Sequence, residues 1–132
     1  MRHDPMTADQ RPAPARDEAT IVEIRTTFPS RAAAEACAER LVAERLAACV
    51  QVEGPVRSTY RWRDAVETAE EFRCTCKTAR ERAEDCMEAI RASHDYETPE
   101  LILALVSASA AYAAWVRASV ADRRVDDEGR GS

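Results

Sequence analysis

The chain has 132 residues with a formal net charge of −5, and it is 33% charged, 45% hydrophobic and only 5% aromatic. This length predicts one domain, and the acidic balance disfavours nucleic acid and anionic membrane surfaces as partners, since both attract basic proteins. Without an apolar run of ~20 residues or the apolar segment of a secretory signal, the chain is expected to be cytoplasmic, with its cysteines as free thiols.

Both ends of the chain are polar. Residues 1–19 contain three of the six prolines, and residues 122–132 carry four acids and three bases. Such segments bury too little apolar surface to offset the entropy lost on ordering. We therefore expect disordered tails at 1–19 and 122–132 around one folded domain at 20–121.

The first half of the domain predicts a strand, a helix and a long hairpin. Residues 20–28 are rich in β-branched side chains, and Ser30 offers an N-cap for the helix that follows. An apolar strand at 46–52 is expected to be interrupted by a bulge or kink at Gly54–Pro55. Residues 56–62 alternate in polarity as a strand with one solvent-exposed face does, and residues 63–65 are the predicted hairpin tip.

The second half begins with a strand in which Phe72, Cys74 and Cys76 share one face. Thr78 and Glu81 have the spacing of a capping box, which predicts a helix start. The apolar run at 101–106 is expected to be a strand buried on both faces.

Ser107 or Ser109 is the expected cap of a last helix. Its predicted inner face comprises Tyr112, Trp115, Val116 and Val120. The order β-α-β-β-α-β-α closes most simply into an α+β, ferredoxin-like split βαβ sandwich with both crossover helices on one face of the sheet.

Most cysteines are predicted to be small core residues. Cys74 and Cys76 are nearly 7 Å apart along a strand, too far for an easy disulfide, although such a pair can also bind a soft metal. Cys37 and Cys86 fall within the apolar stripes of helices. Cys49 follows an apolar segment near a strand start, and taken alone it is also expected in the core.

His94 lies in an acidic loop, residues 94–100, between a helix and a strand. Imidazole with nearby carboxylates suits copper or zinc, but a lone loop histidine also serves in capping or hydrogen bonding, and both roles stay open. The chain has no Gly-rich phosphate loop and no nucleophile elbow, so we expect no organic cofactor and no catalytic activity.

Tyr60 and Trp62 lie near the hairpin tip, where a subunit interface explains two large aromatic side chains; folding back onto the sheet is the alternative. Lys77 is the only lysine in the chain. A compact point charge there suits ligand binding, or it is an ordinary cation at a helix start.

Five ordered motifs, spread from about residue 21 to residue 120, resemble the CutA divalent-cation tolerance proteins. They are Thr27–Ser30, Glu44–Val50, Arg57–Trp62, Lys77–Thr78 and His94–Glu100. The resemblance implies a ferredoxin-like fold in a tight homotrimer, similar in plan to the PII signalling proteins, whose long hairpins pair strands across subunits. It also implies tolerance of copper and other divalent cations, with Cys49, His94 and Glu97 as candidate ligands and no established enzymatic activity.

The expected function is thus a trimeric module that binds Cu(II) or another divalent cation. A second hypothesis is a PII-like small-molecule sensor whose intersubunit cleft is lined by Tyr60, Trp62, Lys77, Tyr96 and Glu97. A purely architectural trimer with a protein partner is the third.

Overall fold

The computed structural model describes residues 19–121. Apart from Ala19, the tails expected at 1–19 and 122–132 lie outside the described residues. The elements are β1 (Thr20–Phe28), α1 (Arg31–Ala43), β2 (Cys49–Trp62), β3 (Ala65–Thr78), α2 (Arg80–Ser93), β4 (Ile102–Ser107) and α3 (Ala110–Ser119). This order is the one that the sequence predicted.

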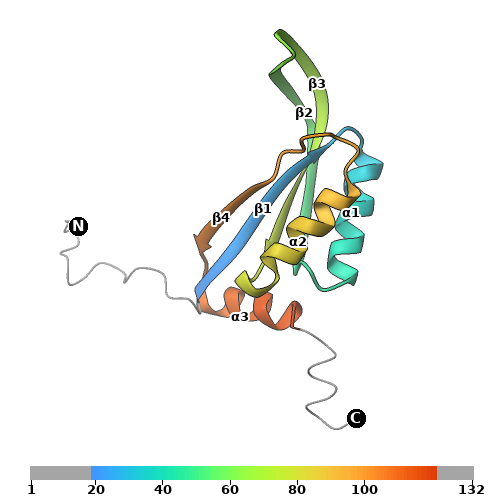
Figure 1. Ribbon diagram of the computed structural model, residues 1–132. Coiled ribbons are helices and arrows are strands. Elements are labelled where there is room, and N and C mark those ends of the chain that lie inside the picture. Colours follow the sequence, from blue (N-terminus) through green and yellow to red (C-terminus); the bar gives the residue numbers. More distant parts are fainter. Residues whose placement is uncertain (1–18, 122–132) are drawn as a thin grey trace, which may run out of the picture.

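The four strands form one sheet in the order β2-β3-β1-β4, and every neighbouring pair is antiparallel. Helices α1 and α2 lie side by side on one face, while α3 lies at the lower end of the sheet (Figure 1). The main core lies between these two helices and the sheet, and a smaller cluster joins α3 to Ile21 on the opposite face. The ferredoxin-like prediction is confirmed.

The hairpin of β2 and β3 extends well past the rest of the sheet (Figure 1). β1 ends at Phe28, opposite Phe72, so the hairpin beyond this point pairs only with itself. Arg63 and Asp64 form its turn with φ angles of 49° and 67°. Two successive left-handed residues match the twist of the flanking strands, and the tip predicted at 63–65 is confirmed.

Strand β2 begins at Cys49 rather than at residue 46. Leu46 and Ala47 instead close the end of α1, because both of their backbone N–H groups donate to the carbonyl oxygen of Leu41. The expected bulge is confirmed, since the register with β3 shifts between Glu53 and Val56.

The capping-box prediction at Thr78 is wrong. Thr78 is the last residue of β3, and its buried hydroxyl donates to the carbonyl oxygen of Leu46 at 2.7 Å. A buried carbonyl without a partner is costly, so the hydroxyl is used there, and α2 starts after Ala79 with no side-chain cap. The other helices have the expected caps, because Ser30 and Ser109 each accept a backbone N–H at 3.1 Å.

Strand β4 is not buried on both faces within one chain. It is an edge strand paired only with β1, and Ile102, Leu103 and Leu105 are 48%, 43% and 52% exposed. Trp115 on α3 is likewise 49% exposed rather than on the inner face, which is occupied by Ala113 and Val116. These apolar side chains lack a covering layer in the single chain.

Candidate functional site

Loop 94–100 crosses the end of β1 and is anchored there by His94. The His94 ring stacks on Phe28 with centroids 4.2 Å apart and an interplanar angle of 4°. Its Nε2 is hydrogen-bonded to Oγ1 of Thr26 at 2.7 Å, whereas its Nδ1 is buried without a partner among residues 19–121. Burial lowers the pKa of His94, opposed by the nearby charges of Asp95 and Glu71, so the ring is neutral near pH 7. The expected hydrogen-bonding role is therefore present.

Tyr96 links the same loop to the hairpin. Its hydroxyl donates to Oε2 of Glu71 at 2.8 Å, and the hydroxyl of Thr27 donates to that same oxygen at 3.4 Å. Burial, together with the bond to Glu71 and its charge, raises the pKa of Tyr96 above the ordinary tyrosine value. A neutral phenol therefore donates to the Glu71 side chain and holds it in place.

The bulge in β2 decides which way the hairpin aromatics point. Glu53 pairs with Arg73 before the bulge and Val56 pairs with Glu71 after it, so β2 carries one extra residue at this point. An extra residue exchanges the two faces of a strand. Beyond the bulge, Tyr60 and Trp62 therefore share a face with Glu71, on the side of the sheet away from α1 and α2.

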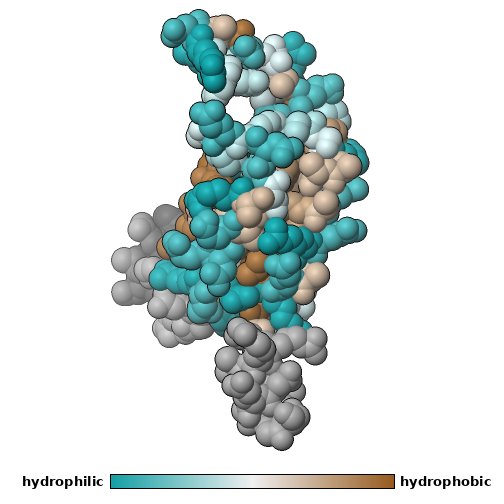
Figure 2. Space-filling model, turned by 45° about the vertical axis from the view of Figure 1, so that its right-hand side comes forward, coloured by the Kyte–Doolittle hydropathy of each residue, from teal (hydrophilic) through white to brown (hydrophobic). Residues whose placement is uncertain are grey.

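These segments line a half-open cavity of about 860 Å³ between the hairpin and loop 94–100. Figure 2 shows the open space between the hairpin end and the body of the molecule, with mostly hydrophilic residues around it. Its acidic lining residues are Glu67, Glu71, Asp95, Glu97 and Glu100, and its aromatic ones are Tyr60, Trp62 and Tyr96. No lysine or arginine lines it among the described residues, so every charged side chain in its lining is acidic.

The structure brings four of the predicted site residues together, namely Tyr60, Trp62, Tyr96 and Glu97. Lys77 does not join them. It lies near the end of β3, paired with Cys49 at the start of β2, and its Nζ donates to Oε1 of Gln51 at 3.0 Å. The sequence reasoning missed Glu67 and Glu71, although their i, i+4 spacing on one strand face was a usable signal.

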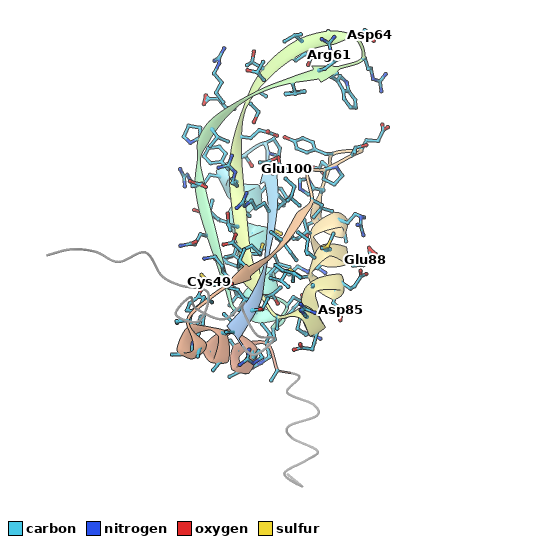
Figure 3. All side chains as sticks on the ribbon, turned by 90° about the vertical axis from the view of Figure 1, so that its left-hand side faces the viewer. Cys49, Arg61, Asp64, Asp85, Glu88 and Glu100 are labelled. Atoms are coloured by element: carbon cyan, nitrogen blue, oxygen red, sulfur yellow. The ribbon has the colours of Figure 1, made fainter. Side chains whose placement is uncertain are left out.

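Cys49 also lies apart from the cavity. It pairs with Lys77, and Figure 3 shows it near α3, far from Glu100 beneath the curved hairpin and from Arg61 and Asp64 near its tip. Within residues 19–121 of one chain, no group of three or more His, Cys, Asp or Glu side chains is placed to hold a metal ion. The ligand set of Cys49, His94 and Glu97 is therefore not assembled by a single chain.

The remaining thiols are core residues, as expected. Cys74, Cys76 and Cys86 are fully buried, and Cys37 nearly so. Burial raises the pKa of Cys74 to about 12, and contact with Cys86 together with burial raises the pKa of Cys76 further. Because metal binding requires a thiolate, the raised pKa values indicate that Cys74 and Cys76 serve packing rather than ligation.

Among the described residues, no helix is long and apolar enough to cross a membrane.

Comparison with known proteins places the fold in a family. The model of the CutA1 divalent ion tolerance protein family matches residues 22–119. The divalent-cation tolerance protein CutA of an Escherichia coli strain is 31% identical over 102 residues, 76% of this chain and 91% of that protein. The chloroplastic CutA of Arabidopsis thaliana is 32% identical over 99 residues, which cover 74% of this chain and 54% of that protein.

Solved structures of CutA proteins support the same family. CutA from Xylella fastidiosa superposes with a TM-score of 0.73 at 34% identity, covering 76% of this chain and 97% of that one. The periplasmic divalent cation tolerance protein CutA from Archaeoglobus fulgidus gives a TM-score of 0.72 at 31% identity, with 76% and 98% covered. Since relatives are named for the chloroplast and the periplasm, a cytoplasmic location for this chain stays a prediction. By fold and by sequence, this chain belongs to the CutA1 divalent ion tolerance protein family.

Proposed function

We propose that this protein is a non-catalytic, self-assembling module that binds divalent cations, copper among them, in support of metal tolerance. Membership of a divalent ion tolerance family supports a divalent cation as the ligand. The observation that carries the proposal is the carboxylate-lined cavity formed by loop 94–100. A cavity lined by five acids attracts cations and repels anions.

His94 and Glu97 are the proposed ligands from this loop. When Nε2 of His94 donates to Thr26, Nδ1 keeps a free lone pair, and an oxygen partner of this kind is what commonly orients a metal-binding imidazole. The unpartnered Nδ1 fits that arrangement, and His94 lies next to the cavity-lining residues in the sequence without lining the cavity itself, whereas Glu97 does line it. Cys49, the third proposed ligand, would have to come from a neighbouring copy.

Copper binding is tested by calorimetric titration of Cu(II) into reduced protein under argon. A His3→Ala background leaves His94 as the only histidine. Replacing His94 with Ala, Glu97 with Gln or Cys49 with Ser is expected to weaken binding by roughly tenfold or more, as losing an element of a metal site does. Glu88→Gln, an exposed acid on α2 (Figure 3), is the matched control and is expected to bind as the parent does. Equal affinity in the parent and the His94 variant would remove His94 from the site.

Self-assembly is proposed as a homotrimer that covers the exposed edge of the sheet. An apolar, unpaired edge strand is a liability unless another chain covers it, and Ile102, Leu103 and Leu105 form such an edge. Tyr60 and Trp62, each 41% exposed, are further candidates for the interface.

Light scattering after size exclusion is expected to give three times the mass of one chain. Leu105→Lys is expected to shift the protein to monomers, because a charge cannot be buried unpaired at an interface core. Val42→Lys, at a 44% exposed position on α1, is expected to leave the assembly intact. A monomeric parent would refute the assembly, and a trimeric Leu105→Lys variant would move the interface elsewhere.

A PII-like small-molecule sensor is the second candidate function. The cavity favours it, because 860 Å³ lies in the range of small-molecule sites and three aromatic side chains line it. Lys77 is not needed for this function, since it lies outside the cavity. The class of ligand then follows from the side chains that do line the cavity.

A further inference from the structure

The walls of the cavity combine two kinds of groups within short reach. Tyr60 on β2 is paired directly with Glu67 on β3, so a phenol ring and a carboxylate stand side by side on one face of the hairpin. Side chains at such paired positions have Cβ atoms about 5 Å apart. Trp62 lies two residues further along the same face, and Tyr96 and Glu97 contribute the opposite wall.

One carboxylate in the cavity is already held in position. The bonds from Tyr96 and Thr27 both reach Oε2 of Glu71, while Oε1 accepts no hydrogen bond from any residue between 19 and 121. Glu71 is half-buried, and Oε1 is not among the described buried atoms that lack a partner, so this oxygen remains open to solvent or to a ligand. A positively charged donor inside the cavity would satisfy it.

The aromatic side chains present ring faces that suit a cation. The guanidinium of Arg63 already lies 5.2 Å from the centroid of the Trp62 ring, within the distance at which a cation interacts with an aromatic face. Within a single chain Tyr60 and Trp62 are both 41% exposed, so each ring keeps surface that a ligand in an intersubunit cleft can contact.

The cavity also has room for a small organic cation, beyond what one metal ion would occupy. The volume of about 860 Å³ far exceeds the coordination shell of one ion, and within one chain the described residues place no three metal-ligating side chains together. Aromatic rings supply no ligand atoms to hard cations, which prefer oxygen, but they contact the carbon skeleton of an organic ammonium ion.

We infer that the cavity binds an organic cation, an ammonium- or guanidinium-bearing small molecule, whose charge pairs with Glu67 and Glu71 and whose carbon skeleton packs on Tyr60 and Trp62. The inference rests on the sensor function proposed above and gives its ligand class. Its recognition elements are hairpin residues, which are not among the proposed copper ligands, and only Glu97 is shared between the cavity lining and the proposed copper site.

Fluorescence of Trp62 provides the test. In a Trp115→Phe background, Trp62 is the only tryptophan of the chain, and the full-length protein in its assembled state is titrated with choline and with spermidine at constant ionic strength. We expect a saturable change in emission for at least one of them. The uncharged isostere of choline, 3,3-dimethylbutan-1-ol, is expected to bind at least tenfold more weakly.

Charge variants locate the site. Glu67→Gln is expected to weaken cation binding by tenfold or more, whereas Glu70→Gln, an acid on the same strand but paired with Arg57 on the other face, is expected to have no effect. Thermal unfolding of both variants is the check that they are folded. If Glu67→Gln binds like the parent, or if the isostere binds equally well, the inference is wrong.

The remaining outcomes separate the ligand class from the sensor function. Binding of an anionic metabolite such as 2-oxoglutarate instead of the cations would contradict the proposed ligand class but remain consistent with the sensor function. No response to any probe, with Trp62 emission insensitive to a soluble quencher such as acrylamide, would mean that a neighbouring copy fills the cavity, and it would overturn both.

Discussion

Replacing Gly54 with alanine is expected to destabilise the protein by about 3 kcal/mol, because a strained backbone and a steric clash coincide at that position. Gly54 has a φ of +152°, which side-chain-bearing residues rarely adopt. A Cβ atom added there would lie 2.6 Å from Cδ2 of Phe72 and 3.0 Å from the carbonyl oxygen of Glu71. The second contact is to backbone, which cannot rotate away. Equilibrium unfolding in urea measures the loss.

Glu53→Ala is the matched control in the same bulge. The ion pair of Glu53 with Arg73 spans 3.2 Å, but both side chains are exposed, so its removal is expected to cost less than about 0.5 kcal/mol. Equal stabilities of the Gly54 and Glu53 variants would show that the bulge tolerates a side chain. The result also bears on function, because the bulge places Tyr60 and Trp62 on the face shared with Glu71.

Leu41→Ala is expected to destabilise the protein by about 3 kcal/mol, as truncation of a fully buried leucine does. Leu41 is 0% exposed and packs between α1 and the sheet in the main core. Its carbonyl oxygen also accepts the N–H groups of Leu46 and Ala47, so the surrounding backbone is constrained and closes the resulting void only in part. Urea unfolding monitored by circular dichroism measures this loss too.

The next residue along α1 supplies the control. Val42 is 44% exposed, so Val42→Ala is expected to change the free energy of unfolding by no more than about 0.5 kcal/mol. A similar loss in both variants would indicate that another chain buries Val42. A loss of less than about 1 kcal/mol for Leu41→Ala would contradict a tightly packed core at this point.

The fold was largely predictable from the sequence because its signals are local. The strand at residues 20–28 has bounds set by β-branched composition, and Ser30 and Ser109 cap their helices as expected. Where the prediction was wrong, a distant partner decided the outcome. Thr78 has a capping residue's spacing, but it bonds to the carbonyl oxygen of Leu46, which lies 32 residues away.

The candidate site was predictable only in part. Tyr60, Trp62, Tyr96 and Glu97 were singled out by their motifs, and they do line one cavity. The position of Lys77 outside the cavity could not be predicted from the sequence, because it depends on the pairing between β2 and β3. Strand register is a property of two segments together, so the residues of one segment do not specify it.

The sequence by itself determined the order of elements, the bulge at Gly54, the acidic character of loop 94–100 and the aromatic residues near the hairpin tip. Periodicity, turn residues and charge are properties of short segments, so they can be read without a structure. Only the tertiary structure decided that hairpin carboxylates and loop 94–100 enclose one cavity, and that Cys49 lies far from it. Both outcomes depend on which strands pair over long sequence distances and on the bulge that exchanges the faces of β2. Strand pairing and the bulge are fixed only when the whole sheet packs.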